Sequence, residues 1–142
     1  MDIENIKDGL KTNIIGSNIL YVQETTSTMD LARELGISGG SNGTVVIAEN
    51  QTAGRGRFGR QWISEPGLNL TFSILIRPEN LNLGQLNMVA SMSIIQAIRQ
   101  TTALKPTIKW PNDIMIDGKK VCGVLITNRV GGSSVEFTVI GI

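Results

Sequence analysis

The segment "LNLTFSILIR", residues 68–77, limits the fold most narrowly because it alternates strictly between apolar and polar residues. Successive side chains of a β-strand point to opposite faces, so this pattern predicts a half-buried strand. The apolar face is expected to carry Leu68, Leu70, Phe72, Ile74 and Ile76, and the other face Asn69, Thr71, Ser73 and Arg77. The chain must therefore form a sheet with a core against one of its faces.

Strand and helix patterns alternate through the rest of the chain. Helices are expected at residues 3–10, 27–36 and 86–102, and strands at 18–24, 44–49, 107–109, 114–117, 120–129 and 135–142. Asp117 and Gly118 suit the tight turn of a β-hairpin. No repeat or linker divides these elements, so one α/β domain is expected.

Three residues mark the ends of the second helix. Ser27 is the expected N-cap, Asp30 its capping-box partner and Gly36 the stop signal. In the third helix, Met88 and Met92 are expected to fill the core.

The composition fits one globular domain without a membrane segment. The chain has 142 residues, of which 41% are hydrophobic, enough for a core. No run approaches the roughly 18–20 consecutive apolar residues of a membrane-spanning helix. The first ten residues are acidic and polar, unlike a secretory signal. We therefore expect a cytoplasmic protein that does not bind a membrane.

The sequence contains no histidine and one cysteine, Cys122. This excludes Ser-His-Asp and Cys-His catalysis and a His/Cys zinc site. Cys122 lies in "KVCGVLI" and is expected to be a small buried residue. Arginine, lysine, carboxylates, amides and the backbone remain, and these suit phosphoryl or nucleotidyl transfer.

The stretch "AGRGRFGRQW", residues 53–62, is expected to be a positively charged loop. No carboxylate lies between Glu49 and Glu65. The loop combines three glycines with three arginines: Gly54, Gly56, Gly59, Arg55, Arg57 and Arg60. Glycine lets the backbone approach an anion closely, and arginine pairs with phosphate or carboxylate oxygens.

Three interpretations of this loop compete. It is a surface connector with solvated arginines, a contact for nucleic acid, or a cradle for a small anion. The net charge of +1 and the aromatic content of 4% argue against nucleic acid, which needs a broad basic surface and stacking side chains. Other segments must decide between the remaining two.

Four separated segments, "TTSTMDLA", "AENQTAGRGRFGRQW", "KWPND" and "GKKVCGVLI", occur in this order between residues 25 and 126. Together they resemble the catalytic domain of biotin protein ligases, which make biotinyl-5'-AMP from biotin and ATP and pass biotin to a carboxylase carrier protein. The resemblance implies the fold shared with class II aminoacyl-tRNA synthetases. This is a two-layer α+β fold in which a mixed, largely antiparallel sheet is flanked by helices.

The resemblance places one set of residues around biotin: Ser27, Thr28, Gln51, Arg55, Gly56, Arg57, Lys120 and Gly123. Ser27 and Thr28 would hydrogen-bond the ureido group, and Lys120 would contact the carboxylate and the mixed anhydride. Gly123 would let the backbone pass close to biotin. Met29 stands where the family often has asparagine, so any side-chain hydrogen bond from that position is lost.

The resemblance also implies a set around ATP or the adenylate: Gly54, Arg55, Arg57, Arg60, Trp62, Lys109 and Asn112. Trp62 would cover the adenylate, and Lys109 and Asn112 would lie near the phosphates or Mg²⁺. The implied catalytic residues are Arg57, Lys120 and Asp113. Asp113 would meet the acceptor lysine. ATP and Mg²⁺ are the expected cofactors, with no direct metal ligation by His or Cys.

The expected activity is that of a ligase that attaches biotin to the biotin carboxyl carrier protein of acetyl-CoA carboxylase. Lipoate ligases share the fold and the two-step chemistry, so a different acyl substrate is the nearest enzymatic alternative. A module that binds biotin or adenylate without turnover is the alternative outside enzymes.

One catalytic domain, incomplete at its C-terminus, is expected over residues 1–142. About two dozen residues precede "TTST", too few for the helix-turn-helix domain of many bacterial members. The family's glycine and asparagine segment and its small C-terminal β domain are expected to be absent. The last strand still continues at Ile142, and an exposed sheet edge there would favour a homodimer.

Overall fold

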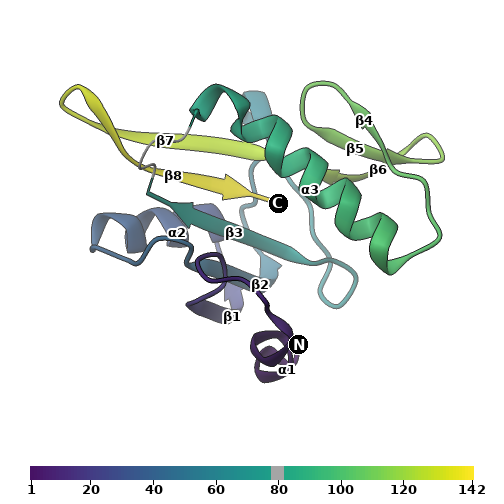
Figure 1. Cartoon of the computed structure of the whole chain (residues 1–142), viewed down its shortest axis with the longest axis horizontal. Helices are drawn as coiled ribbons and strands as arrows, with labels where there is room; N and C mark the ends of the chain where they lie inside the picture. Colours follow the sequence, from purple (N-terminus) through teal and green to yellow (C-terminus); the bar gives the residue numbers. More distant parts are fainter. Residues whose placement is uncertain (78–81) are drawn as a thin grey trace.

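The computed structural model describes residues 1–77 and 82–142, with the elements drawn in Figure 1. The helices are α1 (Ile3–Gly9), α2 (Thr28–Ile37) and α3 (Leu86–Thr101), with short 3₁₀ segments η1 (Arg57–Gly59) and η2 (Leu83–Gln85). The strands are β1 (Ile19–Thr25), β2 (Val45–Gln51), β3 (Thr71–Ile76), β4 (Thr107–Lys109), β5 (Asp113–Ile116), β6 (Lys119–Gly123), β7 (Leu125–Gly131) and β8 (Ser134–Gly141).

The strands form two sheets. The larger has the order β1-β2-β3-β8-β7, with β1 parallel to β2 and the other pairs antiparallel. The smaller has the order β4-β5-β6 and is antiparallel. The strand expected at residues 120–129 is divided at Val124, whose N–H donates to the carbonyl of Asn112 at 2.9 Å. This break lets β6 and β7 join different sheets.

Helices cover both faces of the larger sheet (Figure 1). On one face, Met29 and Ala32 of α2 pack with Leu75 of β3. On the other, Ile94 of α3 packs against Ile76 of β3. The expected α+β class, with a mixed, largely antiparallel sheet flanked by helices, is confirmed. The structure adds that the helices occupy opposite faces, giving three layers where two were expected.

The alternating segment at residues 68–77 is buried differently from the prediction. β3 begins only at Thr71, and Leu68 and Leu70 are 77% and 59% exposed. Ser73, assigned to the polar face, is completely buried and hydrogen-bonds the hydroxyl of Thr28 at 2.8 Å. The reason is that β3 lies between β2 and β8 with a helix on each side, so both faces of the strand are covered.

The prediction that Met88 and Met92 fill the core was wrong. They are 61% and 51% exposed, because α3 turns Ser91 and Ile95 inward instead. The hairpin at residues 117–118 is confirmed, with positive φ at both positions.

The last strand is not a sheet edge. β8 lies between β3 and β7, and the edges of the larger sheet are β1 and β7. The homodimer was expected because the last strand would leave an exposed sheet edge. Among the described residues, β8 does not form such an edge. Within residues 1–77 and 82–142, no helix is long and apolar enough to cross a membrane.

Candidate functional site

A pocket of about 440 Å³ lies where the two sheets meet. It is lined by residues from all four sequence motifs: Ser27, Thr28, Gln51, Arg55, Gly56, Arg57, Arg60, Trp62, Lys109, Asn112, Asp113, Lys120 and Gly123. Of the predicted site residues, Gly54 alone does not line it. The structure therefore brings together side chains that lie up to a hundred residues apart in the sequence.

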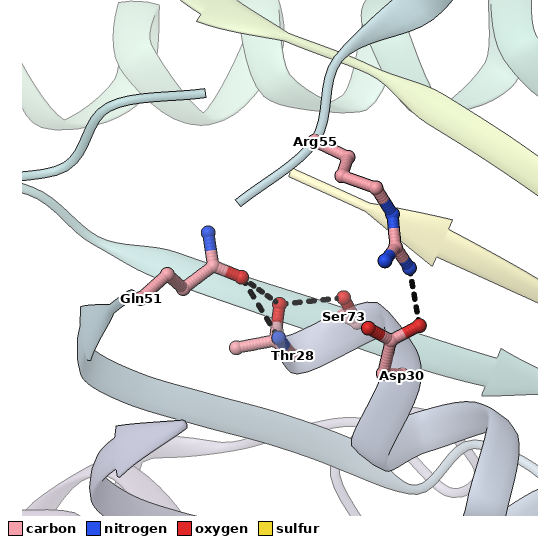
Figure 2. Close-up of polar contacts among 5 residues, drawn as sticks. All are labelled: Thr28, Asp30, Gln51, Arg55 and Ser73. Carbon is pink, nitrogen blue, oxygen red and sulfur yellow. Dashed lines mark hydrogen bonds and ion pairs between the residues drawn. The ribbon is translucent and has the colours of Figure 1, made fainter. Parts of the chain in front are cut away.

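One end of the pocket is a polar network between α2, β2 and β3 (Figure 2). Gln51 Oε1 accepts hydrogen bonds from the backbone N–H of Thr28 at 2.8 Å and from its hydroxyl at 3.1 Å. Thr28 Oγ1 also contacts Ser73 Oγ at 2.8 Å. Because its oxygen is occupied by Thr28, Gln51 keeps the donor end of its amide for another partner.

The capping prediction for α2 was wrong in its detail. Ser27 is the N-cap, but its side chain makes no capping hydrogen bond. Asp30 does not complete a capping box and instead forms an ion pair with Arg55. Ser27 is 2% exposed and lines the pocket, so its hydroxyl is available to a ligand. Met29 also lines the pocket, but it packs into the core between α2 and the larger sheet.

The loop at residues 54–62 folds back on itself as a narrow hairpin. Trp62 N–H donates to the carbonyl of Gly54 at 2.9 Å, and Gly56 N–H donates to that of Arg60 at 2.7 Å. A Cβ at Gly54 would lie 2.6 Å from the carbonyl oxygen of Trp62 and 2.9 Å from Nε2 of Gln51. Gly54 therefore does not line the pocket itself but packs against Gln51 and Trp62, which do, at a position where only glycine fits.

Arg57 connects the tip of this loop to the segment before β5. Its Nη1 donates to Asn112 Oδ1 at 2.8 Å. Asn112 Nδ2 in turn donates to the carbonyl of Val124 at 2.8 Å. Asn87 of α3 donates to the carbonyl of Pro111 at 2.7 Å, so the "KWPND" segment is held from two sides.

Lys120 lies between a carboxylate and an aromatic ring. Its Nζ is 2.8 Å from Asp113 Oδ1 and 5.1 Å from the centroid of the Trp62 ring. A Cβ at Gly123 would lie 3.1 Å from the end of Lys120 and 3.3 Å from Trp62, so the glycine leaves room for both. Cation–π and ion-pair contacts together orient the ammonium toward the pocket.

The pocket is much more positive than the chain as a whole. Among the residues that the structure describes, five cationic side chains and one side-chain carboxylate line it: Arg55, Arg57, Arg60, Lys109, Lys120 and Asp113. The whole chain has a net charge of only +1. Cations concentrated in a concave site attract anions, and planar guanidinium groups match carboxylate and phosphate oxygens. The loop therefore lines a cationic pocket, as the small-anion interpretation expects, and the surface-connector interpretation does not fit its position.

The donor set also limits which metals fit. Among residues 1–77 and 82–142, no three His, Cys, Asp or Glu side chains cluster. Asp113 is a pocket carboxylate, and Asn112 contributes an amide oxygen. Mg²⁺ is commonly held by one or two carboxylates together with substrate phosphates and waters, which fits this set.

Several pocket residues were not predicted from the sequence. Phe58 and Trp110 line the pocket and are 85% and 87% exposed. Both lie inside the recognised motifs, next to the predicted residues Arg57 and Lys109, so their position in the sequence could have identified them as pocket residues. Leu125 also lines the pocket and lies inside the fourth motif, whereas Ile142 lines it from a segment that carries no local sign of a site.

Cys122 lies outside the pocket, on β6. Burial raises the pKa of its thiol, which favours the unreactive neutral form. Cys122 was expected to be a small buried residue, but its side chain is only half-buried.

Known proteins share this sequence and fold. A model of the Biotin/lipoate A/B protein ligase family matches residues 19–142. The bifunctional ligase/repressor BirA of Bacillus subtilis is 37% identical over 96% of this chain and 43% of its own length. The biotin--[acetyl-CoA-carboxylase] ligase of Paracoccus denitrificans is 35% identical over 78% of this chain and 48% of its own length.

The biotin protein ligase from Aquifex aeolicus, solved in complex with biotin and ATP, superposes with a TM-score of 0.73 and 35% identity. The match covers 88% of this chain and 50% of that one. This chain spans less than half the length of the two curated relatives. The fold is that of the class II synthetase-like biotin ligases, and the chain belongs to the biotin/lipoate A/B protein ligase family.

Proposed function

We propose that this chain carries the biotin and ATP site of a biotin protein ligase, which makes biotinyl-5'-AMP and transfers biotin to a lysine of a biotin carboxyl carrier protein. The observation that carries the proposal is one pocket that is lined both by the polar network of Thr28 and Gln51 and by a cluster of five cations. A relative solved with biotin and ATP shares this fold. Biotin has a polar ureido ring and a carboxylate, the two features that such a pocket would bind.

Biotin's ring is assigned to the polar end. Ser27 offers a hydroxyl that makes no capping hydrogen bond, and Gln51 offers its amide N–H groups, because its amide oxygen is occupied by Thr28. These groups match the ureido carbonyl and its N–H groups. Gly56 and Gly123 would let the backbone pass close to the ligand, and the side chain would run toward Lys120.

In the first step, a carboxylate oxygen of biotin attacks the α-phosphorus of ATP, and pyrophosphate leaves. Arg55, Arg57 and Lys120 would stabilise the charge on the carboxylate and the phosphate, and Arg60 and Lys109 that on pyrophosphate. Trp62 would cover the adenylate. Mg²⁺ would arrive on the ATP phosphates and reduce their negative charge, with Asn112 and Asp113 nearest to it.

In the second step, the amine of the acceptor lysine attacks the carbonyl of the mixed anhydride and AMP leaves. Asp113 would accept the proton that the amine loses. It lines the same pocket as Lys120 and lies 2.8 Å from it, so the acceptor amine would meet both groups there. The proposed acceptor is a carrier protein of the cytoplasm.

The proposal is tested by calorimetry with biotin, with and without MgATP, beside an assay of pyrophosphate release. We expect biotin to bind and MgATP to yield pyrophosphate and a retained adenylate. Binding of lipoate in place of biotin would refute the proposal in favour of a lipoate ligase. Biotin binding without pyrophosphate release would indicate a binding module.

A further inference from the structure

We infer that Asp30, which lies outside the motif residues assigned to biotin or ATP, is a positioning residue that fixes Arg55 in the wall of the pocket. The inference rests on the proposed function, because it concerns how the site retains its anionic intermediate. The evidence is the ion pair between Asp30 and Arg55 and the place of that pair between two cavities.

The ion pair joins two elements that each hold part of the site (Figure 2). Asp30 lies in the first turn of α2, two residues after Thr28. Arg55 lies in the stem of the 54–62 loop, where it is bridged to Gln61. Asp30 Oδ1 contacts Nη2 of Arg55. The loop is thereby tied to α2 at its stem, as Arg57 ties its tip to Asn112.

A second, smaller cavity of about 170 Å³ adjoins the main pocket. Met29, Arg55 and Leu125 line both cavities, whereas Asp30 lines the smaller one. Arg55 is therefore part of the wall between the cavities, and Asp30 holds it from the far side. A guanidinium has five N–H donors, so a contact through Nη2 leaves others for an anion in the main pocket.

This arrangement predicts an effect on ligand retention more than on folding. The side chains of Asp30 and Arg55 are 33% and 55% exposed, and ion pairs in contact with solvent contribute little to the free energy of unfolding. Without Asp30, Arg55 and the loop stem lose their attachment to α2. Arg55 must then become ordered when the ligand binds, which lowers the net free energy of binding. The adenylate therefore leaves faster.

The test measures release of a non-hydrolysable phosphodiester analogue of biotinyl-5'-AMP from the full chain. Asp30→Asn should accelerate release by about five- to tenfold, the loss expected for one charge-assisted contact, and Arg55→Gln by at least as much, because it also removes the contact with the anion. The double variant should release the analogue no faster than Arg55→Gln, because Asp30 acts only through Arg55. Asp30→Glu, which keeps the charge, should restore part of the retention.

Glu34→Gln is the matched control, because it removes a second carboxylate from α2, one that is exposed and does not line either cavity. It should release the analogue at the wild-type rate. Unchanged or slower release from Asp30→Asn would overturn the inference, and slower release would identify Asp30 as a competing counter-ion. Additive effects in the double variant would also overturn it. If the wild-type chain does not bind the analogue, the proposed function itself fails.

Discussion

Arg57 and Asn112 are joined by a hydrogen bond of 2.8 Å between Nη1 and Oδ1. Asn112 also donates to the carbonyl of Val124 and accepts from its N–H, at 2.8 and 2.9 Å. One asparagine therefore links the 54–62 loop, the "KWPND" segment and the turn between the two sheets. These tertiary contacts hold the 54–62 loop in place, although its three glycines make its backbone flexible.

Replacing Arg57 with alanine should weaken retention of the adenylate, because both its charge and its bond to Asn112 are lost. Release of adenylate to solvent should rise by about tenfold or more, as expected for a charge-assisted hydrogen bond. Arg99→Ala, on α3 outside the pocket, is the control. Equal release from the Arg57 variant and the wild type would contradict the assignment of the loop.

Asn87 holds the "KWPND" segment from α3 and should affect the nucleotide more than biotin. Asn87→Asp replaces the amide donor with an acceptor, which cannot bond the carbonyl of Pro111. We expect KM for ATP to rise by about threefold to tenfold, the usual range for one hydrogen bond. The dissociation constant for biotin alone, measured by calorimetry, should change little. A parallel loss of biotin affinity would show a general disturbance of the fold.

Gly54→Ala should reduce biotin affinity without contact between the new methyl group and biotin. The Cβ would lie 2.6 Å from the carbonyl oxygen of Trp62 and 2.9 Å from Nε2 of Gln51, so the loop or the amide must move. We expect a loss of about tenfold or more, since a small misplacement of binding groups is costly. Gly9→Ala, with open space around its Cβ, is the control. Normal biotin affinity in the Gly54 variant would show that the wall can adjust.

Lys120→Gln should discriminate between charged and neutral ligands. If Lys120 contacts biotin's carboxylate, the variant loses about tenfold in affinity for biotin, while its affinity for the neutral biotin amide stays close to that of the wild type. Calorimetry with both ligands measures the difference. An equal loss for both would place Lys120 away from the carboxylate, for example as support for Trp62, which it contacts.

The thiol of Cys122 should react slowly with alkylating reagents near neutral pH. Burial raises its pKa, so the folded state favours the neutral thiol and the reactive thiolate forms only at higher pH. The associated stabilisation is full below the thiol pKa of the unfolded chain and is lost as pH rises through the folded value. Labelling rates against pH, in buffer and in urea, measure the shift. A thiol pKa in buffer equal to or lower than the thiol pKa in urea would contradict the predicted rise.

Much of this protein was readable from the sequence because short-range patterns determine local structure. The helix at α2, the strand at β2 and the hairpin at residues 117–118 depend on periodicity and turn residues, and all three are present. The four motifs likewise identified many of the residues that line the pocket, since motif residues report a shared chemistry. Cys122 and the absence of histidine restricted that chemistry further.

Tertiary structure alone decided which faces are buried and which groups meet. The alternation at residues 68–77 did not reveal that Ser73 is buried, because burial depends on helices that cover both faces of β3. The exposure of Met88 depends on how α3 is rotated against the sheet. The pairing of Asp30 with Arg55 and of Arg57 with Asn112 joins residues 25 and 55 positions apart. No local propensity encodes such contacts, since they follow from the way in which the whole chain packs.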